Sequence, residues 1–147
     1  GGLPLTGTVF VSVSDRDKRA IILPVLRLQQ LGFEIVATTG TADVLNRNGI
    51  RARIVSKYSQ RQDPETDEAT IVDLINRNEI DIVINTPSGR LARADGYQIR
   101  AATIAADKPL FTTIAQLGAA VGSIEAVKEG FSVTSLQEYA RARAAAL

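Results

Sequence analysis

The chain has 147 residues, of which 45% are apolar and 22% charged. These are ordinary values for one globular domain, and they exclude a disordered or collagen-like chain. Its 17 basic and 16 acidic side chains leave a net charge of only +1, too small an excess for a wide basic face against nucleic acid or a membrane surface. Cysteine and histidine are both absent, which excludes disulfides, thiolate nucleophiles, soft-metal sites and proton transfer by histidine.

The sequence also carries expectations about the context of the chain. No apolar run approaches the roughly 20 residues that a membrane-spanning helix needs, and no signal peptide opens the chain, so we expect a cytoplasmic protein. Methionine is absent even from position 1. We therefore expect a domain of a longer polypeptide, in which residues 1–7 are the remnant of a linker and residues 8–147 form the domain.

The first part of the chain alternates between apolar, β-branched runs, typical of buried strands, and amphipathic stretches, typical of helices. Gly32 and Gly49 are expected to stop the first two helices, and Pro24 is expected to bend the first. A long polar loop is predicted at Ser56–Thr66. In chain order the pattern predicts a strand at Thr8–Val13, a helix at Asp17–Leu31, a strand at Phe33–Ala37, a helix at Thr41–Asn48 and a strand at Arg51–Val55.

The second part of the chain continues the alternation. Acidic residues in the first turn of the helix predicted at Asp67–Asn76 favour the helix dipole. The elements predicted after it are a strand at Asp81–Asn85, a helix at Gly96–Ala106, a strand at Pro109–Thr113, a helix at Ala115–Glu129, a short edge strand at Phe131–Thr134 and a helix at Leu136–Ala145.

Strands that alternate with helices over short connections call for right-handed βαβ units. The sequence therefore predicts an α/β fold in which helices cover both faces of a largely parallel sheet.

Polar side chains occur where the predicted strands end. Ser12 closes the first strand and Lys18 follows it, Lys57 follows the third, and Asn85 and Ser88 stand at the end of the fourth. In open α/β sheets, ligands bind beyond the carboxyl ends of the strands. These residues are therefore candidates for one binding crevice, although each alone is also consistent with a solvated surface or a packing role.

The turn after the second strand is the most specific of these candidates. Thr38 and Thr41 flank Gly40 where a helix is predicted to begin. The free N–H groups and positive end of a helix attract anions, and glycine lets the backbone approach them closely. The turn predicts a phosphate site, although Thr41 is equally consistent with a plain helix cap.

Catalysis has less support in the sequence. Without histidine, a general base would have to be a carboxylate, a lysine or a tyrosine with a shifted pKa. The acidic candidates are Asp15, Asp17 and Asp63, but the first two flank a helix start, where carboxylates usually serve as caps. GxSxG, Walker and GxGxxG motifs are absent. We therefore predict no catalytic residue and no metal ligand.

Four segments together resemble the methylglyoxal-synthase-like family. In particular they resemble the C-terminal allosteric domains of bacterial carbamoyl phosphate synthetase large chains, from about Thr8 to Tyr139 and with the motifs in the same order. The segments are SVSDRDK at Ser12–Lys18, GFEIVATTGTA at Gly32–Ala42, INTPSGR at Ile84–Arg90 and PLFTT at Pro109–Thr113.

The resemblance implies a three-layer sandwich around a five-stranded parallel sheet, with a site for UMP or IMP. It implies that the phosphate is held by Lys18, Thr38 and Thr41 with Ser12, and that Lys57 and Asn85 lie near the ribose and base.

A member of the family carries a threonine where this chain has Pro87. Proline cannot donate a hydrogen bond, which puts the ribose contact or the preference between nucleotides in question. Ornithine, the activator in enteric enzymes, is expected to touch Thr112, while its other ligands lie outside this chain.

The implied partners are the catalytic domains of the same large chain and the glutaminase small chain, in arginine and pyrimidine biosynthesis. Three alternatives remain open. The first is a methylglyoxal synthase acting on dihydroxyacetone phosphate. Such enzymes need a histidine, which this chain lacks, and they carry an acid about where this chain has Thr86 or Pro87. The others are a cyclohydrolase domain of purine biosynthesis and a domain that serves only as an assembly surface.

Overall fold

The computed structural model describes the backbone of residues 2–55, 70–87 and 93–145, and the side chains of these residues except 93–95 and 131–145. The predicted polar loop Ser56–Thr66 therefore lies outside the described residues. The same is true of three residues singled out above, which are Lys57, Asp63 and Ser88.

A five-stranded sheet forms the centre of the molecule, and all of its strand pairs are parallel. The strand order is β3-β2-β1-β4-β5, so β1 is central and the chain adds strands first on one side and then on the other. The predicted α/β fold with a five-stranded parallel sheet is confirmed. The strands are β1 (Thr8–Ser12), β2 (Glu34–Ala37), β3 (Ala52–Ile54), β4 (Ile82–Asn85) and β5 (Leu110–Phe111).

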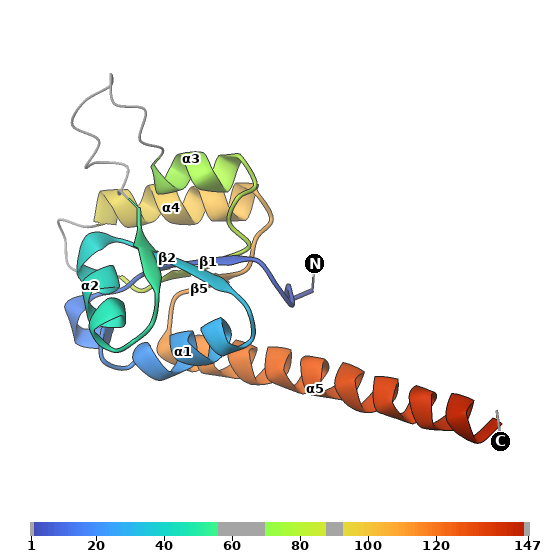
Figure 1. The fold of residues 1–147 in the computed structure, drawn as a ribbon. Helices are drawn as coiled ribbons and strands as arrows, with labels where there is room; N and C mark the ends of the chain where they lie inside the picture. The colour runs from blue at the N-terminus through green and yellow to red at the C-terminus, as the bar shows by residue number, and fades with distance from the viewer. Residues whose placement is uncertain (1, 56–69, 88–92, 146–147) are drawn as a thin grey trace.

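Helices cover both faces of the sheet, which makes three layers (Figure 1). Because side chains alternate along a strand, β1 sends Val9 and Val11 into one core and Phe10 into the other. Helices α1, α2 and α5 pack on the first face, while α3 and α4 pack on the second. The helices are the 3₁₀ turn η1 (Asp15–Asp17), α1 (Ile22–Gln30), α2 (Thr39–Arg47), α3 (Ile71–Asn76), α4 (Arg93–Ala105) and α5 (Ile114–Ala145).

Helix α1 begins later than predicted. Asp17 belongs to the 3₁₀ turn, and α1 starts only at Ile22. Pro24 is therefore the third residue of the helix and lies in its first turn, where a missing N–H costs no intrahelical bond. The prediction that Pro24 lies in the interior of the helix, where it would bend it, was therefore wrong. Gly32 follows the helix with φ +102°, a conformation that glycine adopts without strain, so its predicted role as a stop is confirmed.

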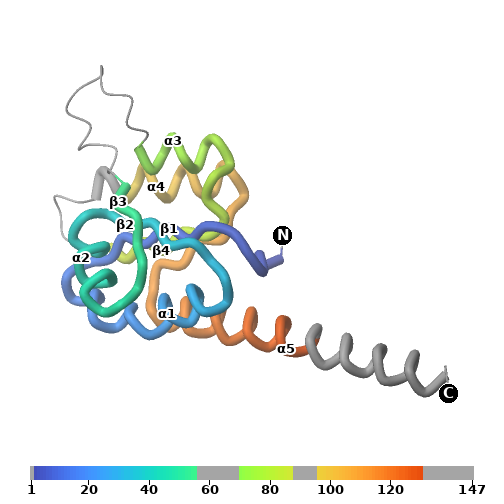
Figure 2. Tube along the Cα trace, in the orientation of Figure 1, coloured from blue at the N-terminus to red at the C-terminus, as the bar shows by residue number. Residues whose placement is uncertain are grey.

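The end of the chain differs most from the prediction. Phe131–Thr134 was predicted as an edge strand between two helices, but these residues lie inside α5, one helix of 32 residues. The first part of α5 runs beside α1 (Figure 2). There Arg27 forms an ion pair with Glu125, and Lys128 Nζ donates to the carbonyl of Leu31. In the described part of the chain no helix is both long and apolar enough to cross a membrane.

Candidate functional site

Three polar side chains form a row across the central strands, at their carboxyl ends. The sheet register pairs Ser12 of β1 with Asn85 of β4, and Thr38 directly follows β2 on the other side of β1. All three are at least 94% buried, and Thr38 Oγ1 donates to Ser12 Oγ at 3.1 Å. The predicted convergence of these strand ends is therefore present in the structure.

The row continues one face of the sheet. Phe10, Val36 and Val83, two residues before each of the three polar side chains, belong to the core beneath α3 and α4. Since side chains repeat on one face every second residue, Ser12, Thr38 and Asn85 stand on that same face. The apolar core thus ends at the carboxyl edge of the sheet in a layer of hydroxyl and amide groups.

Lys18 lies against the start of α2. A Cβ placed on Gly40 would be 2.8 Å from Lys18 Nζ, so the ammonium group is in contact with the glycine backbone. The N–H groups of the first turn have no intrahelical partner, and the Thr38 side chain makes no cap bond with them. Lys18 Nζ is also paired with the exposed carboxylate of Asp15, and an anion bound beside the helix start would be attracted both by the ammonium and by the free N–H groups.

The loop after β1 is held by two threonines, one in α2 and one just after β4. The N–H of Val13 donates to Thr41 Oγ1 at 3.3 Å, and the N–H of Ser14 donates to Thr86 Oγ1 at 2.9 Å. Thr41 is therefore not the helix cap, a position that belongs to Thr38. The Thr41 hydroxyl oxygen accepts from the residue that directly follows β1, not from its own helix. Thr41 therefore ties the loop that contains Lys18 to α2.

The two carboxylates considered as bases have structural partners. Asp15 forms an ion pair with Lys18, and Asp17 Oδ2 accepts a hydrogen bond from Ser14 Oγ at 2.8 Å. Both contacts lie at the 3₁₀ turn η1 but join side chains, and the N-cap of the turn is Ser14, so the structure does not show either carboxylate as a cap. Among the described residues, no group of three or more acidic side chains is placed to hold a metal ion.

Sequence reasoning missed one residue at this edge, Arg100 of α4. Its Nη1 donates to Asn85 Oδ1 at 3.1 Å, while Asn85 Nδ2 approaches the carbonyl of Ser12 at 3.4 Å. Gly96, one turn earlier on α4, lies against the same contact. The helical pattern of α4 shows which residues can be buried, but it does not show which of them meets the end of β4.

The remaining predicted residues either lie away from the row around Ser12 or fall outside the described residues. Thr112 follows β5, two strands away from β1, and its N–H and hydroxyl both face Gln116 Oε1, at 3.2 and 3.5 Å. Pro87 is exposed just beyond β4. Lys57 and Ser88 lie outside the described residues, so their predicted part in the site stays a prediction.

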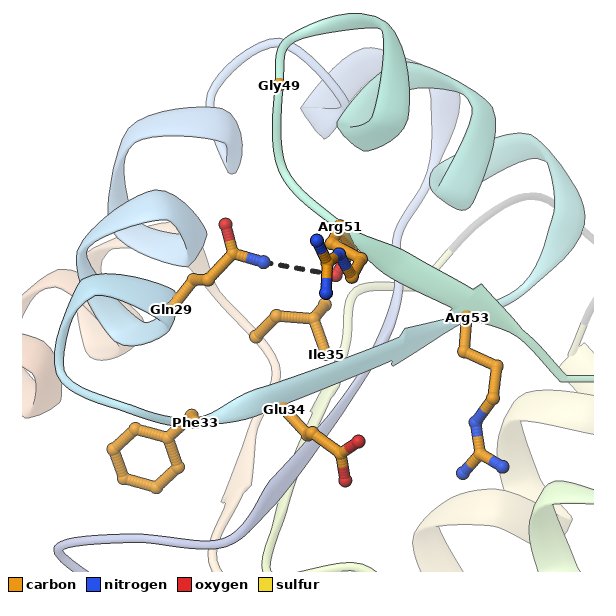
Figure 3. A pocket seen from close by; sticks show the side chains of 7 residues that line it. All are labelled: Gln29, Phe33, Glu34, Ile35, Gly49, Arg51 and Arg53. Atoms are coloured by element: carbon orange, nitrogen blue, oxygen red, sulfur yellow. Dashed lines mark hydrogen bonds between the residues drawn. The ribbon is translucent and has the colours of Figure 1, made fainter.

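A hollow lies at the opposite end of the strands, where β2 and β3 begin (Figure 3). Gln29 closes one side by donating to the carbonyl of Arg51 at 3.1 Å, and the side chains of Glu34 and Arg53, which also line the hollow, point to the same side of β2. Since ligands of open α/β sheets bind at the carboxyl ends, and no helix begins at this hollow, the row around Ser12 is the stronger candidate.

Comparisons with known proteins show which family the chain is similar to. The MGS-like domain family matches residues 20–112. The chain is 72% identical over 145 residues to the carbamoyl phosphate synthase large chain of Clavibacter sepedonicus, and 62% identical over 146 residues to that of Beutenbergia cavernae. In both cases the match covers 99% of this chain and 13% of the relative, so the chain spans about an eighth of their length.

The fold has a solved counterpart. The crystal structure of ForH superimposes with a TM-score of 0.57 over 81% of this chain and 79% of that one, at 18% identity, a likeness of fold alone. The family match covers more than half of the chain and includes β2, the start of α2 and β4. The chain therefore belongs to the MGS-like domain family.

Proposed function

We propose that this chain is the allosteric domain of a carbamoyl phosphate synthase large chain and binds a nucleoside monophosphate, UMP or IMP, at the carboxyl ends of β1, β2 and β4. The observation that carries the proposal is the contact of the Lys18 ammonium with Gly40 at the start of α2. This arrangement suits a phosphate, while Asn85, on the other side of Ser12, suits the ribose and base.

The proposal assigns the domain a regulatory role. Its partners are the catalytic domains of the same large chain and the glutaminase small chain, and its effect is on arginine and pyrimidine biosynthesis. Ornithine acts beside Thr112, in a site completed by residues outside this chain. Regulation requires that the nucleotide bind two states of the enzyme unequally, and the coupling free energy is typically about 1–3 kcal/mol.

Calorimetric titration of the chain with UMP and IMP, repeated with Lys18→Ala, tests the proposal. Hydrogen bonds to charged groups contribute about 1.5–3 kcal/mol, so the substitution should weaken nucleotide binding about tenfold to a hundredfold. Lys108→Ala is the matched control, because Lys108 precedes β5 at the opposite end of the sheet. Equal affinity before and after the Lys18 substitution would remove Lys18 from the site.

Two further outcomes distinguish the alternatives. Formation of methylglyoxal from dihydroxyacetone phosphate above background would replace the regulatory function with an enzymatic one. A folded chain that binds neither nucleotide at millimolar concentration would favour a domain used only for assembly.

A further inference from the structure

The carboxyl end of β4 carries a contact that the proposed function leaves unexplained. Arg100, half-buried on α4, donates from Nη1 to the carboxamide oxygen of Asn85 at 3.1 Å, and Asn85 is only 5% exposed. Arginine has donors and no acceptor, so the atom that faces it must be the amide oxygen. The guanidinium therefore fixes the orientation of the Asn85 carboxamide, with Oδ1 turned toward Arg100.

The backbone of α4 is adapted to this contact. A Cβ at Gly96 would lie 2.7 Å from Arg100 Nη1 and 3.4 Å from Asn85 Oδ1. Glycine inside a helix costs about 1 kcal/mol relative to alanine. At this position any side chain would displace the guanidinium from the amide, so the glycine makes room for the contact.

The oriented amide keeps capacity for a ligand. Its nitrogen is turned toward the carbonyl of Ser12 at 3.4 Å, which leaves one N–H of the amide and one lone pair of its oxygen free of these two contacts. Within the described part of the chain, Arg100 forms no ion pair. Its positive charge and remaining donors therefore stay beside Asn85.

Arg100 and Lys18 occupy opposite sides of the β1 end. Lys18 contacts the start of α2, which follows β2, and Arg100 contacts the last residue of β4. Two inter-strand spacings, about 9.5 Å, separate β2 from β4. A ligand with a phosphate at one end and carbonyl or hydroxyl acceptors at the other suits two cationic groups that stand beside strands this far apart.

We propose that Arg100 is a positioning residue that sets the orientation of the Asn85 carboxamide and so determines how the end of a nucleotide remote from its phosphate is recognised. The inference rests on the proposed nucleotide site. It predicts that loss of the contact weakens nucleotide binding without affecting the phosphate end.

Two variants test this inference by separate routes. Arg100→Ala removes the donor, and Gly96→Ala keeps it but displaces it, while also favouring the helix. Each should lower the affinity for UMP and IMP about fivefold, as expected for loss of one oriented hydrogen bond. Affinity for inorganic phosphate should stay unchanged in both variants, whereas Lys18→Ala should weaken phosphate and nucleotides alike. Arg77→Ala, an exposed arginine at the end of α3, is the control.

A spectroscopic readout separates positioning from general stabilisation. The side-chain ¹⁵N–¹H signals of Asn85 should move in Arg100→Ala and return toward the parent position in Arg100→Lys, which keeps a donor. An unchanged ratio of nucleotide to phosphate affinity in both Arg100→Ala and Gly96→Ala would overturn the inference and leave the proposed function standing. A parent chain that binds phosphate but neither nucleotide would overturn both.

Discussion

Gly40 occupies the point where a helix start and a lysine meet, so its substitution should separate stability from anion binding. In Gly40→Ala the new Cβ would lie 2.8 Å from Lys18 Nζ, the far end of a flexible side chain that can move away. Alanine favours the helix by up to about 1 kcal/mol. We expect equal or higher stability in urea denaturation, together with weaker phosphate binding in calorimetry.

Gly118→Ala is the matched control for that substitution. Gly118 lies within α5, and no atom would come within 4 Å of a Cβ there. It should gain similar helix stability without any change in phosphate affinity. If Gly40→Ala bound phosphate as tightly as the parent chain, the contact between Lys18 and α2 would have no part in anion binding.

Thr86 should contribute to stability through its hydroxyl. It is buried, and its Oγ1 accepts the N–H of Ser14 at 2.9 Å. Thr86→Val keeps the shape but leaves a buried donor without a partner, which costs about 1–3 kcal/mol. The free energy of unfolding measures this loss. Thr39→Val, at an exposed position of α2, should have a much smaller effect, and similar losses in both variants would contradict the assignment.

At the residue scale, strand-end chemistry predicted the location of Ser12, Thr38 and Asn85, because parallel strands present their carboxyl ends at one edge. It did not predict the particular bonds. Thr41 was predicted as a phosphate ligand or a cap. The cap position belongs to Thr38, and the Thr41 oxygen accepts the N–H of Val13, while its O–H keeps the capacity to donate, so its part in phosphate binding stays a prediction. A side chain that bonds to another element, as this one does, leaves no local signal in the sequence.

The contact between helices α1 and α5 should make stability depend on pH. A hydrogen bond from Arg27, with Nε to Oε2 at 3.1 Å, lowers the pKa of Glu125, and the same bond raises the pKa of Arg27. A carboxyl whose pKa is lower in the folded state than in the unfolded state stabilises the folded state at pH values above its unfolded-state pKa. That contribution is lost as the pH falls through the lowered pKa.

Glu125→Gln should therefore be less stable than the parent chain near pH 7, and the difference should shrink as the pH falls through the lowered pKa of Glu125 and disappear below it, where the carboxyl is protonated in both states. Because both side chains are partly exposed, about 1 M salt should also reduce the difference. Glu129→Gln, one turn further along α5, is the control. A stability difference that persisted unchanged at low pH would exclude the ion pair as its cause.

Helix α5 shows where element-scale prediction fails. The β-branched and aromatic residues of Phe131–Thr134 favour a strand locally, yet the helix continues through them. Intrinsic propensities differ by less than about 1 kcal/mol per residue, so a helix already stabilised by packing can extend through such a run. Leu117, Val121 and Ile124 provide that packing against the sheet.

At the scale of the whole molecule, the alternation of strands and helices was sufficient to predict the parallel sheet and its two covered faces. It could not give the order β3-β2-β1-β4-β5, because the same alternation is compatible with several strand orders. The order matters for the proposed function, since it places Ser12 between Thr38 and Asn85 and so brings together three segments that are far apart in the sequence.

A site shared by three strands exists only in the folded chain, so a nucleotide should stabilise the whole molecule. At a hundred times the dissociation constant the gain is about 2.7 kcal/mol, and a domain of this size gains about 2–4 °C for each kcal/mol. We therefore expect UMP or IMP to raise the Tm of the chain by about 5–10 °C in calorimetry. Ornithine should leave the Tm unchanged, because under the proposed function Thr112 supplies only part of the ornithine site. A rise with ornithine equal to that with UMP would show that this chain alone completes both sites.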